Sequence, residues 1–253
     1  MEINLKGKKA IVTGGSGQLG RCIVRSLAEC GADVAIHYHR NRDKAEELVA
    51  ELKALGRHAG AYQADITEEL SILAMRDRVY EEFGKPDILV NNAVIQYNWK
   101  NILDQDSADF FSQIESCVMH NVYMNKAFVP HLMEQRYGRI IVMNTECAMR
   151  SDPGSAAYVA GKRGLDGIVR CLAKEIGPYN ITVNQVAPGW TISDKDRNEH
   201  GEIQPDYDKT VPLGHRGTDQ DIANMVCFLA SDLAAFTTGA FIPVAGGRVM
   251  PAI

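Results

Sequence analysis

The sequence predicts an α/β fold in which a parallel β-sheet is covered by helices on both faces. Short β-branched runs alternate with longer helical patterns, which is typical of strands joined by helical crossovers. The first of these runs leads through a glycine-rich turn directly into a helical pattern. The chain has 253 residues, enough for one domain with a complete buried sheet, and it shows no internal repeat or low-complexity linker. We therefore expect a single domain over residues 1–253.

Six apolar runs predict the strands, and helical patterns predict the crossovers between them. The strands are expected at 9–14, 33–38, 58–65, 87–92, 139–144 and 181–188. Shorter helices are expected at 18–31, 42–56 and 68–84, each ending on a glycine suited to the C-cap, and longer ones at 104–136 and 156–176. The longer helices carry apolar residues on more than one face, which predicts contacts with both the sheet and another subunit.

Residues 189–215 form the one long stretch without a periodic pattern. The segment is polar and contains Pro205 and Pro212. A loop of this length in a compact domain is usually functional or mobile, so we expect it to be a substrate loop. A surface insertion without a function is the alternative interpretation.

Composition and charge argue against several classes of function. The formal net charge is -5 and the pI is near 5.8, with both signs mixed along the chain, so no nucleic-acid surface is expected. The six cysteines include no C-x-x-C pair, which predicts reduced thiols and no metal site. The N-terminal residues lack the apolar segment of a signal peptide, and no run of about 18 residues is apolar. We therefore expect a cytoplasmic protein without a membrane span.

The sequence "VTGGSGQLG" at 12–20 follows the first predicted strand and opens the first predicted helix. Gly14, Gly17 and Gly20 permit a tight turn, close approach of the backbone to a pyrophosphate, and close packing of the helix on the strand. The free amides at the start of the helix add the positive end of its dipole. A glycine-rich turn that binds nothing is the alternative for this motif taken alone.

A second motif predicts a site of proton transfer. Lys162 follows Tyr158 by four residues, which is one turn of a helix, and Thr145 precedes Tyr158 by thirteen residues. A phenol with a pKa of about 10 is a poor base at neutral pH, and an adjacent ammonium favours its ionised form. Thr145 supplies a hydroxyl that can donate a hydrogen bond to the same reacting oxygen.

These motifs occur in an order that resembles the short-chain dehydrogenases/reductases over nearly the whole chain. The resemblance rests on the glycine-rich first turn, Asp65, "NNA" at 91–93, Asn121, Thr145, Tyr158 with Lys162, "NQVAPGW" at 184–190 and "DIANMVCFLASD" at 221–232. It implies a doubly wound Rossmann fold with a seven-stranded parallel sheet, a nicotinamide cofactor, and hydride transfer between that cofactor and a carbonyl or alcohol carbon. The match is to the compact, single-domain branch, which includes 3-oxoacyl carrier-protein reductases.

The resemblance also implies a role for each matching residue. Tyr158 would be the general acid for reduction and the general base for oxidation, with Lys162 lowering its pKa and holding the nicotinamide ribose. Thr145 would orient the carbonyl, and Asn121 would support a water relay to Lys162. Asp65 would contact the adenine, while Asn91 would stabilise the sheet. The expected cofactor contacts are Gly14, Ser16, Gly17, Gln18, Leu19, Tyr38, His39, Arg40, Asp65, Ile66, Asn92, Ala93, Val94, Tyr158, Lys162, Pro188, Gly189 and Thr191.

The end of the second strand predicts which nicotinamide cofactor binds. An acidic residue there normally accepts hydrogen bonds from the ribose hydroxyls of NAD, and the resemblance places Tyr38 at that position. His39, Arg40 and Arg42 can instead meet a 2′-phosphate, so NADP is favoured over NAD. Solvated loop charges without a ligand are the alternative.

The chain departs from the family pattern at four places. Gln18 replaces a glycine of the first turn, giving the T-G-x-x-G-x-x-G spacing typical of the larger sugar-nucleotide epimerases, which have a longer C-terminal substrate region. Thr145 stands where serine is usual, and Val94 follows "NNA" where glycine is usual. "VAGG" at 244–247 replaces the usual "VDGG", and the sequence offers no interpretation of that change.

The substrate is expected to be a small carbonyl or alcohol compound. Its candidate contacts are Gln96, Tyr97, Glu146 and Trp190, and the carboxylate of Glu146 would select a polar or cationic substrate unless it points into solvent. Two other functions remain as alternatives: a sugar-nucleotide epimerase or dehydratase, and a catalytically silent nucleotide-binding protein. The resemblance further implies a homotetramer.

Overall fold

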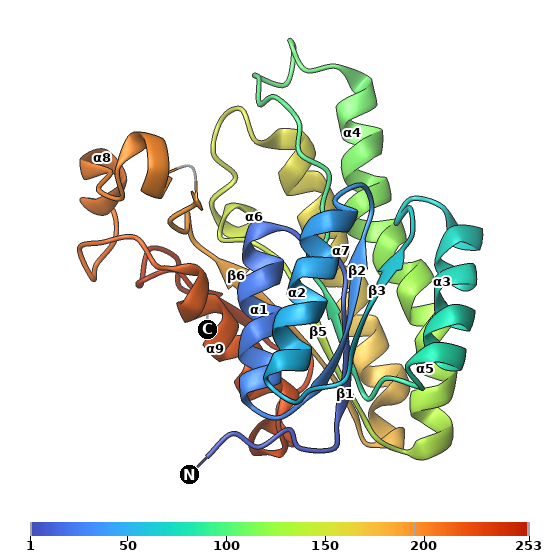
Figure 1. The fold of residues 1–253 in the computed structure, drawn as a ribbon. Helices are drawn as coiled ribbons and strands as arrows, with labels where there is room; N and C mark the ends of the chain where they lie inside the picture. The colour runs from blue at the N-terminus through green and yellow to red at the C-terminus, as the bar shows by residue number, and fades with distance from the viewer. Residues whose placement is uncertain (1, 195, 252–253) are drawn as a thin grey trace.

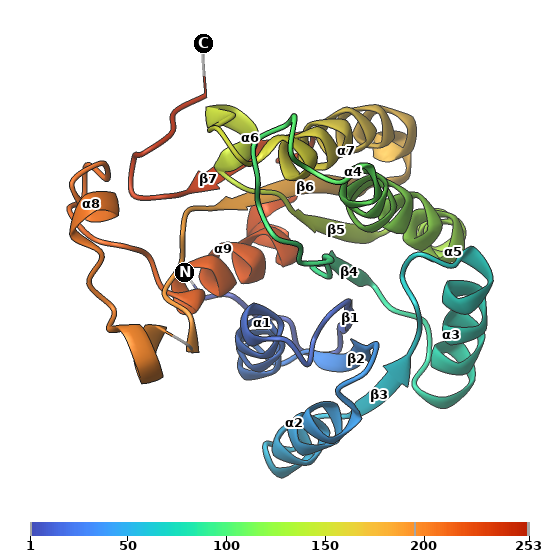
Figure 2. The ribbon, with the colours of Figure 1, turned by 90° about the horizontal axis from the view of Figure 1, so that it is seen from above.

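The computed structural model describes residues 2–194 and 196–251, and it confirms the predicted sheet. Seven parallel strands, some of them labelled in Figure 1, lie side by side in the order β3-β2-β1-β4-β5-β6-β7, which can be followed in Figure 2. Their bounds are β1 Lys9–Val12, β2 Asp33–Tyr38, β3 Ala59–Gln63, β4 Ile88–Asn91, β5 Gly138–Met143, β6 Ile181–Pro188 and β7 Phe241–Val244. The chain runs outward from β1 to β3 and then returns to β4 on the other side of β1, so the strand order reverses between β1 and β4.

Helices cover both faces of this sheet, as predicted. On one face lie α1 (Gln18–Glu29), α2 (Arg42–Ala54) and α9 (Asp219–Ala230); on the other lie α3 (Glu69–Glu82), α5 (His120–Gln135) and α7 (Ala156–Ile176) (Figure 2). Successive residues of β1 enter the two opposite cores, since Ala10 and Val12 pack with the first helix group and Ile11 with the second. Burial of both strand faces is the reason that the strands are continuous apolar runs.

The glycines predicted to end the first three helices do so. Gly31, Gly56 and Gly84 have φ values of 101°, 74° and 100°, a left-handed conformation that glycine adopts without a steric penalty. The remaining short elements are α6 Cys147–Arg150, η2 Gly177–Tyr179 and η4 Asp232–Ala234. None of the helices in the described residues is both long and apolar enough to cross a membrane.

The single helix predicted over 104–136 is wrong in detail. The structure has α4 (Ser107–Gln113), a π-helical turn η1 (Ile114–Met119) and α5 in succession. Side chains here compete for backbone carbonyls, because Ser116 Oγ donates to the Ser112 carbonyl (2.7 Å) and Asn121 Nδ2 donates to the Cys117 carbonyl (2.7 Å). Such π turns often occur at functional sites, and this one ends at Met119, two residues before Asn121.

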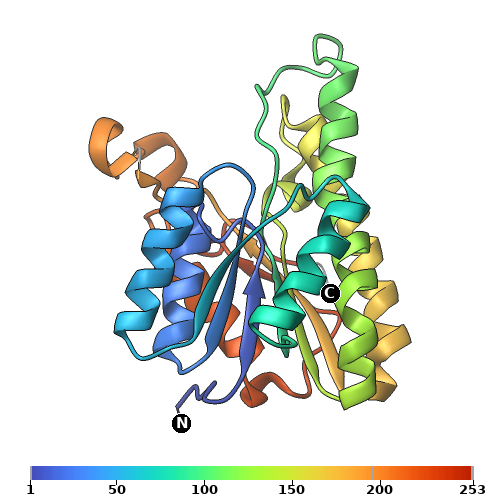
Figure 3. The same ribbon diagram turned by 45° about the vertical axis from the view of Figure 1, so that its right-hand side comes forward.

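The 189–215 segment is more ordered than its composition predicts. It contains a π-helical turn η3 (Asp196–His200) and a short helix α8 (Pro205–Asp208). This segment and the loop that precedes α4 rise on opposite sides above the carboxyl ends of the strands (Figure 3). The space between them lies where ligands bind in open parallel sheets.

Candidate active site

A cavity of about 1190 Å³ opens at the carboxyl ends of the strands. Its walls come from the turns after β1 to β6, and it spans the point where the strand order reverses. Seventeen of the eighteen predicted cofactor contacts line it, and Tyr38 is the exception; the lining also includes Gly20, His37, Asn41, Thr67, Ile95, Gln96, Met143, Asn144, Thr145, Trp190 and Ser193.

The glycine-rich turn has the close contacts that its motif predicts. Gly17 is the N-cap of α1 and makes no side-chain cap, so the amides at the start of the helix face the cavity without a competing side-chain acceptor there. A Cβ on Gly20 would lie 2.1 Å from the Gly14 carbonyl oxygen, so only glycine allows the helix to pack this closely on the turn. The Gln18 amide crosses the cavity edge and donates to the Ile192 carbonyl (3.1 Å).

The end of β4 is tied to this turn by neutral groups. Thr13 Oγ1 accepts hydrogen bonds from the backbone amides of Asn92 (2.9 Å) and Ala93 (3.1 Å). Asn92 Nδ2 donates back to the Thr13 carbonyl (3.0 Å). Because β1 and β4 are neighbouring strands, these bonds fix the floor of the cavity.

His37 supports the glycine-rich turn and was not predicted from the sequence. Its Nδ1 accepts a hydrogen bond from the Gly14 amide (2.9 Å), so Nε2 carries the proton and donates to the Ala64 carbonyl (3.1 Å). Burial lowers the pKa of His37 to about 4, which keeps the ring neutral near pH 7. A single histidine within an apolar strand gives no local signal of this role.

The prediction that Tyr38 contacts the cofactor is wrong. The Tyr38 side chain is buried in the core beneath α1 and α2, because alternate residues of β2 face opposite sides of the sheet. Its neighbours His39 and Arg40 do line the cavity. Asp65 lies opposite, with Oδ2 3.6 Å from His39 Nε2. Partial burial acts to raise the pKa of Asp65, but two hydrogen bonds from Thr67 hold it below the ordinary value.

Tyr158, Lys162 and Thr145 come together in the same cavity. Tyr158 and Lys162 lie one turn apart on α7, and Lys162 Nζ is 5.6 Å from the centre of the Tyr158 ring. The ammonium donates to the Met143 carbonyl at the end of β5 (2.6 Å). Thr145 follows the same strand, and its Oγ1 accepts a hydrogen bond from the Cys147 amide (3.2 Å), which leaves the hydroxyl hydrogen free to donate elsewhere.

The ionisation of this group differs from the sequence prediction. Burial is the largest influence on Tyr158 and raises the pKa of its phenol, while the Thr145 side chain acts in the opposite direction. Burial also lowers the pKa of Lys162. The direction set by burial is opposite to the lowering of the Tyr158 pKa expected from Lys162, and the phenol keeps its proton near pH 7.

Asn121 lies beneath the cavity and does not line it. Its Oδ1 accepts from Asn91 Nδ2 (2.8 Å), and its own Nδ2 donates to the Cys117 carbonyl (2.7 Å). Both ends of the side chain are thus engaged in joining β4 to the π turn. This pairing agrees with the stabilising role expected for Asn91.

The chain is similar to known proteins over nearly its whole length. The family model described as Enoyl-(Acyl carrier protein) reductase matches residues 16–248. The 3-oxoacyl-[acyl-carrier-protein] reductase FabG of Staphylococcus aureus is 37% identical over 253 residues, covering 96% of this chain and 98% of the relative. The enzyme of that name from Escherichia coli is 36% identical, covering 98% and 100%. The crystal structure of a candidate gluconate dehydrogenase from Agrobacterium tumefaciens superposes with a TM-score of 0.92 at 26% identity, covering 99% and 100%.

This chain belongs to the short-chain dehydrogenase/reductase family. It is a nicotinamide-dependent oxidoreductase that acts on carbonyl or alcohol groups of a small-molecule substrate. The family assignment favours this activity over the epimerase or dehydratase and over the silent nucleotide-binding protein considered from the sequence.

Aromatic side chains lie beside Tyr158 on the substrate side of this dehydrogenase/reductase. Tyr97 and Trp99, from the loop after β4, stack at 6.4 Å between ring centres, and Trp99 lies 5.7 Å from the Tyr158 ring. The Tyr97 hydroxyl accepts a hydrogen bond from the Tyr158 amide (2.9 Å). Gln96 and Trp190 line the cavity, whereas Tyr97 and Trp99 contact Tyr158 without being part of the cavity lining.

The prediction that Glu146 selects a cationic substrate is not supported. Its side chain is almost completely buried, and Oε1 accepts hydrogen bonds from the Tyr207 hydroxyl (2.9 Å) and from the Arg248 guanidinium. The carboxylate is therefore neutralised inside the protein. Arg248 lies 102 residues away in sequence, so no local pattern could have revealed the pair.

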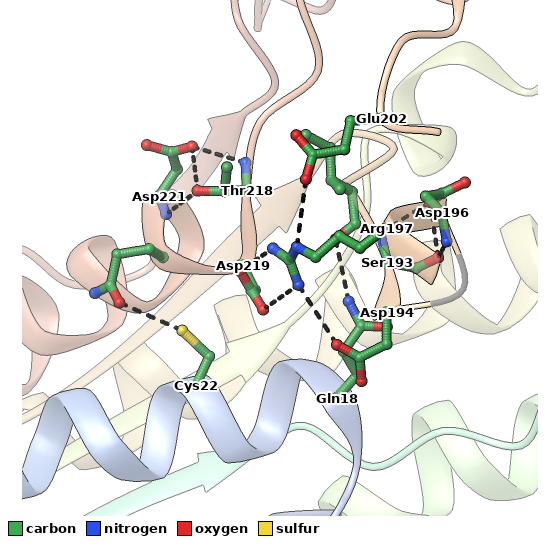
Figure 4. A network of polar contacts seen from close by, with 12 residues as sticks. Gln18, Cys22, Ser193, Asp194, Asp196, Arg197, Glu202, Thr218, Asp219 and Asp221 are labelled. Atoms are coloured by element: carbon green, nitrogen blue, oxygen red, sulfur yellow. Dashed lines mark hydrogen bonds and ion pairs between the residues drawn. The ribbon is translucent and has the colours of Figure 1, made fainter. Parts of the chain in front are cut away.

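Ion pairs hold the 189–215 segment in place beside α1 and α9. Arg197 pairs with Asp194 (3.4 Å), Asp219 (2.8 Å) and Glu202 (3.8 Å), as Figure 4 shows. Arg21, in the first turns of α1, also pairs with Asp194 (2.6 Å). The segment predicted as a substrate loop is thus joined by charged side chains to the helix that carries the glycine-rich turn.

A buried ion pair joins Asp196, within this segment, to Arg216, the residue that directly follows the segment. Arg216 Nη1 lies 3.1 Å from Asp196 Oδ2, and the two side chains are 0% and 8% exposed. The Arg216 guanidinium also lies 4.8 Å from the centre of the Trp190 ring. Hydrogen bonds from Ser193, together with Arg216, lower the pKa of Asp196 to about 2. Trp190, a wall of the cavity, therefore rests on a buried charged pair.

Proposed function

We propose that this protein is an NADPH-dependent carbonyl reductase in which Tyr158 protonates the substrate oxygen. The observation that carries the proposal is that Tyr158, Thr145 and Lys162 line one cavity together with the glycine-rich turn. Bound NADPH would supply the hydride. The names of the relatives favour 3-oxoacyl thioesters and related β-keto compounds as the first substrates to test.

The phenol is in the protonated form that a general acid requires. Burial raises its pKa, so Tyr158 carries its proton near pH 7 and can give it to a carbonyl oxygen as negative charge develops there. Thr145 would donate a hydrogen bond to the same oxygen and fix its position. Lys162, held by the Met143 carbonyl, would place its charge beside the phenolate that forms and bind the ribose hydroxyls.

Asn121 is proposed to act by position and not by side-chain contact with the relay. Both ends of its amide are engaged, which holds the π turn and the end of β4 beside Lys162. Any bond to a relay water would therefore use the backbone.

The test compares wild type with Tyr158→Phe across β-keto thioesters, β-keto esters, sugar ketones and cyclic ketones, following the loss of NADPH absorbance. The variant should lose about 10³-fold in kcat, within the range for removal of a general acid, and still bind NADPH. Turnover unaffected by the substitution would exclude Tyr158 as the acid.

NADP is proposed over NAD because the end of the cavity that would hold the adenosine ribose carries the Arg40 guanidinium and a further nitrogen donor, His39. His39 and Arg40 line it, and the nearest carboxylate, Asp65, is already bonded to Thr67. Arg40→Gln should raise the KM for NADPH about tenfold, as expected for a charge-assisted phosphate contact, and leave the KM for NADH unchanged. Arg42→Gln serves as the matched control, because Arg42 lies outside the cavity and next to Glu46. A lower KM for NADH than for NADPH in wild type would refute the assignment.

The 189–215 segment is proposed to close the substrate side of a single-domain enzyme, with Gln96 and Trp190 as contacts and Tyr97 as a support.

A homotetramer is also proposed, since Phe111 and Ile114 on α4 and η1 are 69% and 40% exposed and would be covered by another subunit. Light scattering would detect a monomer if this is wrong. The free thiols of the described chain favour the reducing cytoplasm as the place of action.

A further inference from the structure

Glu146 lies where three segments of the chain meet. It directly follows Thr145, and its backbone amide donates to the Pro188 carbonyl at the end of β6 (2.9 Å). Its side chain reaches α8 through Tyr207 and the C-terminal segment through Arg248. Thus one residue joins the strand that carries Thr145 to both segments that enclose the substrate side.

Glu146, Tyr207 and Arg248 form a junction whose charged groups are shielded from solvent. The side chains of Arg248 and Glu146 are 12% and 3% exposed. Arg248 Nε also donates to Thr210 Oγ1 (2.7 Å), and its guanidinium lies 4.1 Å from the centre of the Tyr207 ring. Removing one partner of such a pair leaves the other charge buried without compensation.

Tyr207 connects the junction to Trp190, which lines the cavity. Its hydroxyl donates to Glu146 and accepts from the Trp190 amide (2.7 Å), and the two rings meet edge to face at 5.4 Å. A Cβ on Gly189 would lie 2.8 Å from that hydroxyl and 3.2 Å from Ala245, so glycine at 189 permits this approach. The backbone position of Trp190 thus depends on a hydroxyl that Glu146 orients.

We propose that Glu146, Tyr207 and Arg248 are positioning residues that set the distance between Trp190 and Thr145 across the substrate site. They determine how tightly the substrate is held, while proton transfer stays with Tyr158. This inference rests on the proposed reductase function, since it assigns Trp190 to the substrate wall. It also gives the small residue of "VAGG" a role, because Ala245 packs against Gly189 beside this junction.

Tyr207→Phe is the sharpest variant, because it deletes only the hydroxyl and keeps the ring under Arg248. We expect the substrate KM to rise about tenfold, as for loss of a hydrogen bond to a charged group, with kcat and the KM for NADPH within about twofold of wild type. Arg248→Gln should act in the same direction, and Arg248→Lys should restore part of the effect. Glu146→Gln combined with Arg248→Gln should cost less than the sum of the two single changes.

The matched control is Arg139→Gln. Arg139 is 2% exposed and pairs with Asp232 (2.9 Å), but it lies at the start of β5, at the opposite end of the sheet. This variant should lower the melting temperature without changing the substrate KM. If Arg139→Gln and Tyr207→Phe change KM alike, or if Tyr207→Phe lowers kcat alone, the positioning role is wrong.

A readout without turnover separates this inference from the proposed reaction. In a Trp99→Phe background, Trp190 is the only tryptophan, so its fluorescence reports the junction directly. Tyr207→Phe should change that emission, and Tyr158→Phe should not. An unchanged Trp190 emission in Tyr207→Phe would overturn the inference, even if Tyr158 proves to be the general acid. A changed emission would support the inference, even if Tyr158 proves not to be the general acid.

Discussion

The two sides of the cavity are built from different kinds of contact. On the cofactor side, Thr13, Asn92 and His37 hold the strand ends through hydrogen bonds between neutral groups and backbone. On the substrate side, the 189–215 segment is held by arginine–carboxylate pairs outside the sheet. Neighbouring strands bring the cofactor contacts together, whereas the 189–215 segment depends on charged pairs with Asp219 and Arg216, which lie outside it.

This difference predicts that substitutions on the two sides of the cavity impair binding for different physical reasons. On the cofactor side, substitutions should act through steric effects, and their effect on binding should not depend on pH. Changes on the substrate side should depend on charge, and they should alter the substrate KM more than the cofactor KM.

Asp196→Asn, on the substrate side, should cause a larger loss of local stability than the changes on the cofactor side. It leaves the fully buried Arg216 guanidinium without its carboxylate, which typically costs about 3 kcal/mol. Because Arg216 lies over the Trp190 ring, we expect the 189–215 segment to open in hydrogen exchange and the substrate KM to rise more than the KM for NADPH. An equal rise in both would contradict the division between the two sides.

The same pair predicts a pH dependence with a definite sign. The pKa of Asp196 is lowered to about 2 in the folded protein, against about 3.9 in an unfolded chain. Its contribution to stability is therefore complete above about pH 3.9 and is lost as the pH falls toward about 2. Trp190 emission in the Trp99→Phe background should change over this window in wild type. Asp196→Asn should abolish the transition; if the transition persists, another group causes it.

Gly20→Ala tests the cofactor side by a steric change alone. The new Cβ would lie 2.1 Å from the Gly14 carbonyl oxygen, and overpacking of this kind costs about 1–3 kcal/mol. The KM for NADPH should rise while the substrate KM stays within about twofold. Gly167→Ala on α7 is the control, since a Cβ there meets nothing within 4 Å and should stabilise the helix by about 0.5–1 kcal/mol. A loss of similar size in both variants would point to a general helix effect.

The sequence predicted the cofactor side better than the substrate side, because local patterns determine the first and contacts between distant residues determine the second. Strand β2 lies at Asp33–Tyr38 as expected, and Gly14, Gly17 and Gly20 form the predicted turn, because local periodicity and glycine spacing determine both. Tyr38 lies in the core and not in the cavity because it shares a face of the sheet with Val34 and Ile36 beneath α1 and α2.

Glu146 and the π turn show what local patterns cannot reveal. The environment of Glu146 is set by Arg248 and Tyr207, which lie 102 and 61 residues away. The π turn before Asn121 arises from side chains that bond to backbone carbonyls within an otherwise ordinary helical pattern. In both cases the sequence supplied the residue but not its partner.

Gln18 bridges the two sides, and its replacement is the smallest change that tests whether they are independent. Its amide donates from the first turn of α1 to the Ile192 carbonyl of the 189–215 segment (3.1 Å). Gln18→Met keeps the length of the side chain and removes the donor, which should cost about 1 kcal/mol, or about fivefold in binding. If this bond couples the sides, the KM values for NADPH and for substrate should rise together. A rise in only one would mean that Gln18 serves that side alone, and that the arginine pairs are what keep the segment in register with α1.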